Sequence, residues 1–239
     1  MVLMGPLAVS TIVRIEAYDR SYVYTVGMEM GATKRRILER AAAVASTEGL
    51  ERVTVGRLAE DLGMSKAGIY GHFGSKERLQ LETITLGLEI FRGHVVAPAQ
   101  QAPPGLPRLW ALCAAYLDYV AAKVFPGGDF FVTVANEYDT RTGPVHDEIA
   151  SAIAIWMRRL EGLIVDAVEL GHLSPCDPAQ LAFEFEALLV AGNHMYHLDN
   201  DPEALALARV GIARRLEDLR TPGAPPLAQN HRGWQPGQA

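Results

Sequence analysis

Apolar residues along this chain recur every three or four positions almost throughout, whereas sustained alternation of apolar and polar residues is rare. The first pattern places apolar side chains on one face of an α-helix, and the second is the pattern of half-buried β-strands. Glycine and proline separate the helical stretches at short intervals. The sequence therefore predicts an all-α fold of about nine helices.

Four helices are predicted between residues 33 and 95. Thr33, Thr54, Ser65 and Ser75 each precede a run of helical periodicity, and hydroxyl side chains of this kind cap helix N-termini. A glycine follows each of the first three runs and favours the end of a helix there. We therefore expect tight turns between these helices.

Five further helices are expected, over about residues 107–124, 130–140, 144–170, 178–198 and 202–219. Pro98 and the pair Pro103-Pro104 interrupt the helical pattern and predict a domain boundary near residue 98. Beyond Thr221 the chain is rich in proline, glycine and glutamine, a composition typical of disorder. The predicted organisation is a flexible tail over 1–30, a small helical domain over 31–96, a larger helical domain over 97–220 and a disordered tail over 221–239.

Charge is distributed unevenly along the chain, whose net charge is -6. Between Ala32 and Arg78 nine Lys or Arg residues stand against six Asp or Glu, whereas the rest of the chain has 13 against 22. A basic N-terminal module on an acidic body is typical of a protein that binds phosphate groups at one end.

Cysteine usage and the N-terminal residues bear on the cell compartment. Cys113 and Cys176 are the two cysteines, too few for a disulfide framework, which fits a reducing compartment. Charged residues interrupt the apolar run of residues 1–13 before it reaches membrane-spanning length, and the run lacks the basic flank of a signal peptide. We expect a cytoplasmic protein without membrane association, with translation starting at Met28 or Met30.

The stretch from Thr54 to Lys76 predicts two short helices joined by a tight turn. Ala59 is small where the two helices must cross closely, and Gly63 supplies the left-handed backbone conformation that the turn needs. Apolar residues hold the crossing angle from the inside, and these are Leu58, Leu62 and Ile69. The pattern indicates a helix-turn-helix.

The outward residues of the second helix are small, polar or amphipathic, which suits a helix that enters the major groove of DNA. Thr54 and Ser75 lie at helix N-termini, where free N–H groups favour a phosphate. The candidate DNA-contacting residues are Thr54, Ser65, Lys66, Ala67, Gly68, Tyr70, His72 and Lys76. For two of these residues an alternative to DNA contact stays open. Tyr70 would then pack on the domain surface, and His72 would pack beside Phe73 instead of contacting a phosphate.

The segment from about Thr33 to Phe91 resembles the DNA-binding domain of the TetR family of bacterial repressors. The resemblance rests on the runs 58–65 (LAEDLGMS) and 69–79 (IYGHFGSKERL). Gly71 departs from the family pattern, in which a bulkier residue is common, and this predicts a looser end of the recognition helix.

The resemblance implies a homodimer that presents two recognition helices to a palindromic operator in double-stranded DNA. It also implies a ligand cavity among the fifth to eighth helices, coupled to the DNA through the fourth helix. A shift of a few ångströms between the recognition helices, whose half-sites lie about 34 Å apart, would release the operator. The expected protein is a repressor released by a small apolar or aromatic effector.

Aromatic residues of the larger domain are candidates for the effector site, because ligand pockets are mostly apolar with a few polar groups. Most aromatic residues on helices belong to the core, so each candidate has that alternative. The predicted ligand-binding residues are Trp110, Tyr116, Phe130, Phe131, Asn136, Tyr138, Trp156, Phe185, Asn193 and His194.

The predicted helix over 178–198 is apolar on nearly every side, so each side must be buried. We expect one side to pack on its own domain and another on a second subunit. The last helix offers a matching apolar stripe of Leu205, Ala208, Ile212, Leu216 and Leu219. Together these two helices predict a four-helix dimer interface.

Catalysis, a cofactor and a metal ion are not expected. Glu137 and Asp139, like Glu184 and Glu186, are two positions apart and point in different directions on a helix. His194, His197 and Asp199 could share a helix face, but a His-x-x-His pair alone is weak support for a metal. The alternatives are an activator, a regulator that responds to a protein, and a helical ligand-binding enzyme with a vestigial helix-turn-helix.

Overall fold

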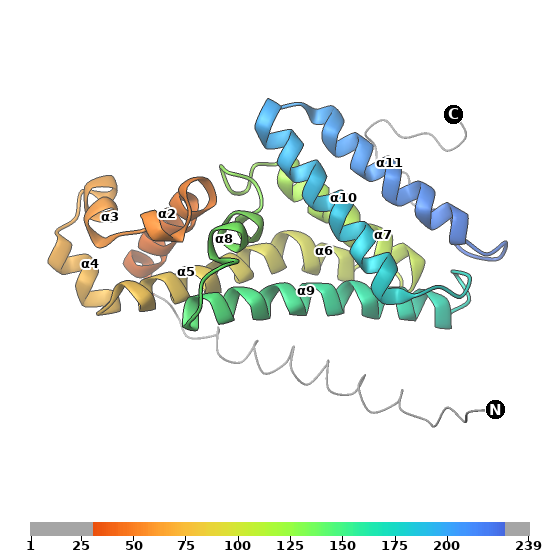
Figure 1. Ribbon diagram of the computed structural model, residues 1–239, viewed down its shortest axis with the longest axis horizontal. Helices are drawn as coiled ribbons and strands as arrows, with labels where there is room; N and C mark the ends of the chain where they lie inside the picture. Colours follow the sequence, from red (N-terminus) through yellow and green to blue (C-terminus); the bar gives the residue numbers. More distant parts are fainter. Residues whose placement is uncertain (1–30, 228–239) are drawn as a thin grey trace, which may run out of the picture. The chain divides into compact units, whose positions relative to one another are not determined.

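The structure of the protein is a computed structural model that describes residues 31–227 (Figure 1). By contacts between Cα atoms the chain forms two compact units, Met1–Arg36 and Ile37–Ala239. The first unit is described only over residues 31–36, and the fold is that of the second. The flexible tail predicted over residues 1–30 lies outside the described residues.

The N-terminal helices are α2 (Ala32–Glu48), the short 3-10 helix η1 (Leu50–Arg52), α3 (Val55–Leu62), α4 (Lys66–Phe73) and α5 (Lys76–Phe91). Three of the four predicted caps are confirmed. The side chains of Thr54, Ser65 and Ser75 accept hydrogen bonds from backbone N–H groups in the first turns of α3, α4 and α5. The cap predicted at Thr33 is wrong, because α2 begins one residue earlier, at Ala32.

Helix α5 does not end at a domain boundary. It continues through a π-helical turn, η2 (Arg92–Val96), into the short helix α6 (Ala97–Gln100). Pro98 lies in the first turn of α6, directly after the π-helical turn η2, and its fixed φ is compatible with a helix. The proline that predicted a boundary near residue 98 therefore lies inside a continuous helical run.

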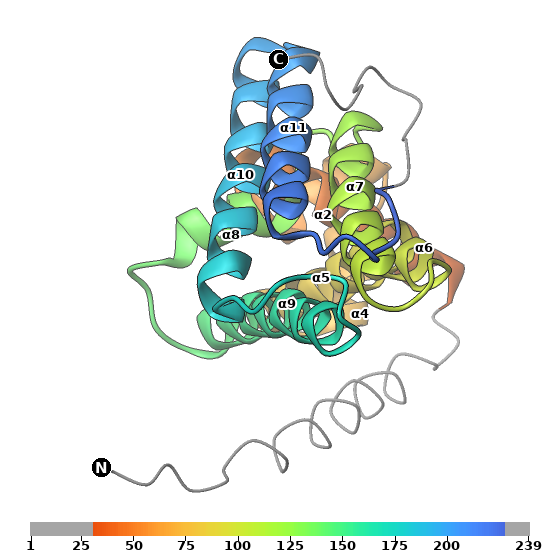
Figure 2. The same cartoon turned by 90° about the vertical axis from the view of Figure 1, so that its right-hand side faces the viewer.

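The remaining helices are α7 (Leu106–Ala121), α8 (Phe130–Tyr138), α9 (Pro144–Glu169), α10 (Pro178–Asp199) and α11 (Pro202–Leu219). With α5, η2 and α6 counted as one, residues 31–227 contain nine helices longer than one turn and no β-strand. The predicted all-α fold is confirmed. Helices α10 and α11 lie side by side in both views (Figures 1 and 2).

The apolar stripe predicted on the last helix as a dimer surface packs inside the chain. Leu205, Ala208, Ile212 and Leu216 are at most 7% exposed. The side of α11 that faces solvent instead carries Leu207, which is 61% exposed. The prediction was wrong because helical spacing identifies an apolar face without saying which neighbour covers it.

Residues 221–227, predicted to be disordered, pack against the loop that follows α9. The N–H of Thr221 donates to the carbonyl of His172, and Ala224 and Leu227 are buried. The proline-rich composition therefore did not prevent ordering, because two apolar side chains find a surface to cover. Residues 228–239 lie outside the described residues.

The loop between α7 and α8 contacts the end of α2. Gly127 donates its N–H to Ser46 Oγ at 3.3 Å, and Thr133 Oγ1 donates to the Ser46 carbonyl at 3.0 Å. A Cβ atom at position 127 would overlap the backbone carbonyl of Ser46. Glycine is thus required by close approach of two backbones, and this contact ties the helix-turn-helix to the rest of the fold.

Gly127→Ala is expected to lower the free energy of unfolding by about 1–3 kcal/mol, because the two backbones must separate. Urea denaturation followed by circular dichroism measures the loss. Gly162→Ala, where nothing lies within 4 Å of the added Cβ, is the matched control. It is expected to raise stability by about 0.5–1 kcal/mol through helix propensity. Equal stability of the two variants would contradict the predicted close contact.

Candidate nucleic-acid interface and ligand site

The predicted helix-turn-helix is formed by α3, the turn at Gly63 and α4. Gly63 has φ 63° and ψ 33°, the left-handed conformation, and its N–H donates to carbonyls at the end of α3. Leu58 and Ile69 are fully buried at the crossing of the two helices, and Leu62 is half-buried. The turn and its packing therefore follow the sequence prediction.

Every residue predicted to contact DNA is exposed. Tyr70 is 56% exposed, so it does not pack into the domain. The ring of His72 lies 6.1 Å from that of Phe73, but His72 also faces solvent. The exposed set is Thr54, Ser65, Lys66, Ala67, Gly68, Tyr70, His72 and Lys76. The second helix thus presents a surface of small and polar groups.

The two lysines of this surface differ in their partners. Lys76 Nζ lies 2.6 Å from Glu51 Oε2 and also donates to the Glu51 carbonyl at 3.1 Å. A phosphate would have to compete with that carboxylate for Lys76. In the described part of the chain no ion pair involves Lys66, which stands in the first turn of α4. Lys66 is therefore the more available cation.

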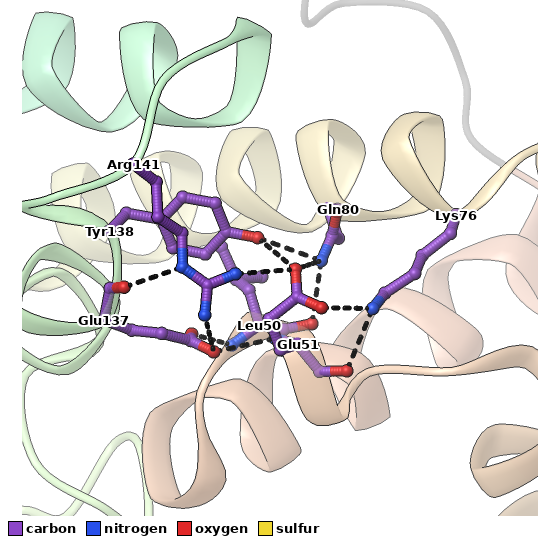
Figure 3. A network of polar contacts seen from close by, with 7 residues as sticks. All are labelled: Leu50, Glu51, Lys76, Gln80, Glu137, Tyr138 and Arg141. Atoms are coloured by element: carbon purple, nitrogen blue, oxygen red, sulfur yellow. Dashed lines mark hydrogen bonds and ion pairs between the residues drawn. The ribbon is translucent and has the colours of Figure 1, made fainter.

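A polar junction joins η1 and the start of α5, which flank the helix-turn-helix, to the end of α8 (Figure 3). The Glu137 carboxylate accepts the backbone N–H groups of Leu50 at 2.6 Å and Glu51 at 3.1 Å, so it caps the N-terminus of η1. Gly49, just before η1, has φ 86°, and a Cβ there would lie 2.5 Å from Glu137 Oε2. The glycine is needed both for its conformation and for this approach.

Glu51 is the centre of the junction. Its carboxylate binds Lys76, accepts a hydrogen bond from the Tyr138 hydroxyl at 2.8 Å, and lies 3.2 Å from the Arg141 guanidinium. The hydrogen bond from Lys76, followed by that from Tyr138, lowers the pKa of Glu51 from 4.5 to about 2. Tyr138, predicted as a ligand residue, therefore lies at the junction. No sequence pattern indicates this position, because the partners are up to 87 residues apart.

Five aromatic rings from α5, α7, α8 and α9 form an aromatic cluster in the larger part of the fold. Phe91 is central, with its ring centroid 5.3 Å from Trp156, 5.6 Å from Tyr119, 6.2 Å from Tyr116 and 6.3 Å from Phe131. Three of these residues, Tyr116, Phe131 and Trp156, were predicted to bind a ligand. Phe91 was missed because it belongs to the helix assigned to the DNA-binding domain.

Two carboxyl groups border the aromatic cluster. Glu186 Oε2 accepts the indole N–H of Trp156 at 2.7 Å, and burial raises the pKa of Glu186. Asp129 accepts hydrogen bonds from the Tyr116 hydroxyl and the Phe131 N–H, both at 2.9 Å. Burial raises the pKa of Asp129 from 3.8 to about 6. Both acids were absent from the predicted site.

The other predicted ligand residues are not among the five rings of the aromatic cluster, although Phe130 contacts Phe131. Trp110, Phe130 and Phe185 are at most 2% exposed and belong to the core. Asn193 is buried, and its side-chain oxygen accepts the backbone N–H of Asp129 at 2.9 Å, a structural role. Asn136 and His194 are exposed, so they do not supply polar groups to a buried ligand. The apolar helical spacing in the sequence does not tell these residues apart from residues that line a ligand site. A buried core face and a ligand-binding face have the same spacing.

Within residues 31–227, no cluster of three or more His, Cys, Asp or Glu side chains has the arrangement of a metal site. Across the same residues, no helix is both long enough and apolar enough to cross a membrane.

Two family models match the chain. The model described as "Bacterial regulatory proteins, tetR family" matches residues 37–83, and the model described as "Tetracyclin repressor-like, C-terminal domain" matches residues 105–212. A curated relative, the HTH-type transcriptional regulator BetI of Rhizobium meliloti (strain 1021), is 28% identical over 169 residues. The match covers 70% of this chain and 78% of the relative.

Solved structures share the fold. A TetR transcriptional regulator from Chloroflexus aurantiacus J-10-FL has a TM-score of 0.72 at 20% identity, over 78% of this chain and 94% of that chain. AibR, solved in complex with isovaleryl coenzyme A and operator DNA, has a TM-score of 0.62 at 26% identity. That match covers 74% of this chain and 96% of AibR.

Acid is expected to weaken the junction. Because the pKa of Glu51 in the folded protein, about 2, lies below its ordinary value of 4.5, ionised Glu51 stabilises the fold above pH 4.5. That contribution is lost as the pH falls from 4.5 towards 2. Glu51→Gln should therefore lose less stability than the wild type between about pH 7 and about pH 3 in urea denaturation. The control is Glu60→Gln, an exposed carboxyl on α3, which should behave as the wild type. Equal pH dependence of Glu51→Gln and the wild type would contradict the prediction.

Proposed function

The chain belongs to the TetR family of transcriptional regulators, and we propose that it is a repressor that binds a palindromic operator as a homodimer and is released by a small effector. The observation that carries the proposal is the exposed face of α4, on a helix-turn-helix whose buried side is fully packed. The relative AibR was solved with both a small molecule and operator DNA, which supports a regulator of this kind.

The chemistry of this surface indicates which groups would contact phosphates and which would contact bases. Capped N-termini of α3, α4 and α5 point N–H groups and the positive ends of helix dipoles outward, which suits phosphates. Gly68 and Ala67 allow α4 to approach base edges closely, and Tyr70 extends from the same surface. Phosphate contacts would set the position on DNA, and the residues of α4 would read the bases.

Lys66→Ala combined with Tyr70→Ala is expected to weaken operator binding by at least about tenfold, with the salt slope reduced by about one. The probe is a labelled duplex of the DNA upstream of the protein's own gene, titrated by fluorescence anisotropy at several salt concentrations. Arg158→Ala removes one exposed cation from α9 and is the matched control, expected to leave binding unchanged. Unaltered binding by the double variant would remove α4 as the DNA surface.

The proposed dimer uses the solvent side of α10 and α11. Phe183, Met195 and Leu198 on α10 are 64%, 52% and 71% exposed, and Leu207 on α11 is 61% exposed. Large apolar side chains exposed along two adjacent helices are typical of an interface between subunits. A second copy of the chain is the occupant that a palindromic operator requires, because the two half-sites need two recognition helices.

Phe183→Glu combined with Leu207→Glu is expected to shift the molar mass from dimer to monomer, because burial of two carboxylates opposes association. Light scattering after size-exclusion chromatography measures the mass. Leu170→Glu is the control, since Leu170 is 53% exposed but lies at the end of α9. A dimer that survives the double substitution would contradict this interface.

An activator would use the same DNA surface, and a reporter gene placed behind the operator separates the two modes. The enzyme alternative has less support in the geometry. Glu137 caps η1, and Glu184 pairs with Arg215 at 2.8 Å, so these acids are engaged in structural contacts.

A further inference from the structure

The proposed function requires an effector, and the aromatic cluster constrains its chemistry. We propose that the aromatic cluster, with Glu186 at its edge, binds a compact quaternary-ammonium cation, and that this cation takes the place of the Phe91 ring. The regulatory meaning of this inference rests on the proposed function, but the binding can be measured without DNA.

The first argument is the arrangement of rings around Phe91. Four ring centroids lie 5.3–6.3 Å from that of Phe91. A cation is attracted to an aromatic ring within about 6 Å of its centroid. A quaternary ammonium at the position of the Phe91 ring would therefore lie within or close to this range of four rings at once.

Ring orientation supports the same conclusion. The planes of Phe91 and its four neighbours meet at 67–89°. In such pairs the positive edge of one ring meets the negative face of another. Where the edge of Phe91 meets the face of a neighbouring ring, a cation in the place of Phe91 would meet the same negative face.

The second argument is charge. Glu186 is hydrogen-bonded to Trp156, and the charge that acts on it, Asp129, has the same sign. In the described residues no ion pair joins a Lys or Arg to either acid, and the buried guanidinium of Arg209 is held by Asp118 at 2.7 Å. An unpaired carboxylate in an apolar surrounding is costly. A cationic ligand would supply the missing counter-charge, whereas a neutral ligand would leave it absent and an anion would be repelled.

The position of Phe91 connects this site to DNA. Phe91 is the last residue of α5, and the π-helical turn η2 follows it directly. π-helical turns are rare and frequently occur at functional sites. Expulsion of the Phe91 ring by a ligand would change the end of α5, whose other end begins beside α4 at the Ser75 cap.

Calorimetric titration with a matched pair of ligands tests the charge requirement. Choline and 3,3-dimethylbutan-1-ol have the same shape and the same hydroxyl group, but only choline is charged. We expect the wild-type protein to bind choline at least about tenfold more tightly than the neutral alcohol. Equal affinity for both, or binding of neither, would overturn the proposal.

Variants locate the site. Glu186→Gln keeps an oxygen that accepts the Trp156 N–H but removes the charge, so it should lose most of the preference for choline. Glu184→Gln, two residues away and paired with Arg215, is the control and should keep the preference. Phe91→Ala should bind choline at least as tightly as the wild type, because the competing ring is gone. A retained preference in Glu186→Gln, or weaker binding by Phe91→Ala, would contradict the assigned roles.

The operator duplex then separates this inference from the proposed function. Choline is expected to weaken DNA binding by the wild type and not by Glu186→Gln. Failure of the wild type to bind the duplex, with choline binding intact, would refute the proposed function and leave the cation site standing. DNA binding that choline does not alter, despite tight choline binding, would refute the effector role alone.

Discussion

One continuous helical run, from α5 through η2 to α6, connects the region beside the recognition helix to the aromatic cluster. Its N-terminus is set by the Ser75 cap beside the recognition helix, and Phe91 at the end of α5 lies in the aromatic cluster. The 16 residues of α5 extend about 24 Å at about 1.5 Å per residue. A helix of this length moves as a rod, because each of its turns is held by hydrogen bonds to the next. The π-helical turn is the place where that regular pattern changes.

Helix α8 provides a second connection between the same two regions. Asp129, its N-cap, accepts a hydrogen bond from Tyr116 at the aromatic cluster, whereas Glu137 near its other end caps η1, just before the helix-turn-helix. Between them Phe130 packs against Gly87 of α5, where a Cβ would lie 3.0 Å from the ring. The junction at Glu51 is polar and partly exposed. Water can replace its hydrogen bonds at a lower cost in free energy than the separation of a buried apolar contact requires.

Much of the local structure could be predicted from the residues alone. The caps at Thr54, Ser65 and Ser75 and the left-handed turn at Gly63 are local effects, and all four are as expected. The cap expected at Thr33 is a local error, because α2 begins one residue earlier. The apolar stripe of α11 was matched to a second subunit but packs on its own chain. Its periodicity identified the buried face, whereas packing decided which neighbour covers that face. A phosphate contact of Lys76 stays a prediction, to which the structure adds an ion pair with Glu51.

The sequence by itself determined the helices, the helix-turn-helix and the residues that face outward from it, because caps, glycine turns and apolar periodicity act within a few residues. Only the tertiary structure decided which aromatic residues meet. It brought Phe91 among rings from three other helices, placed Glu186 beside Trp156 and moved Tyr138 to the junction. The ring pairs and hydrogen bonds among these residues join positions that are 25 to 87 residues apart in the sequence. No local rule specifies them, since each depends on how whole helices pack.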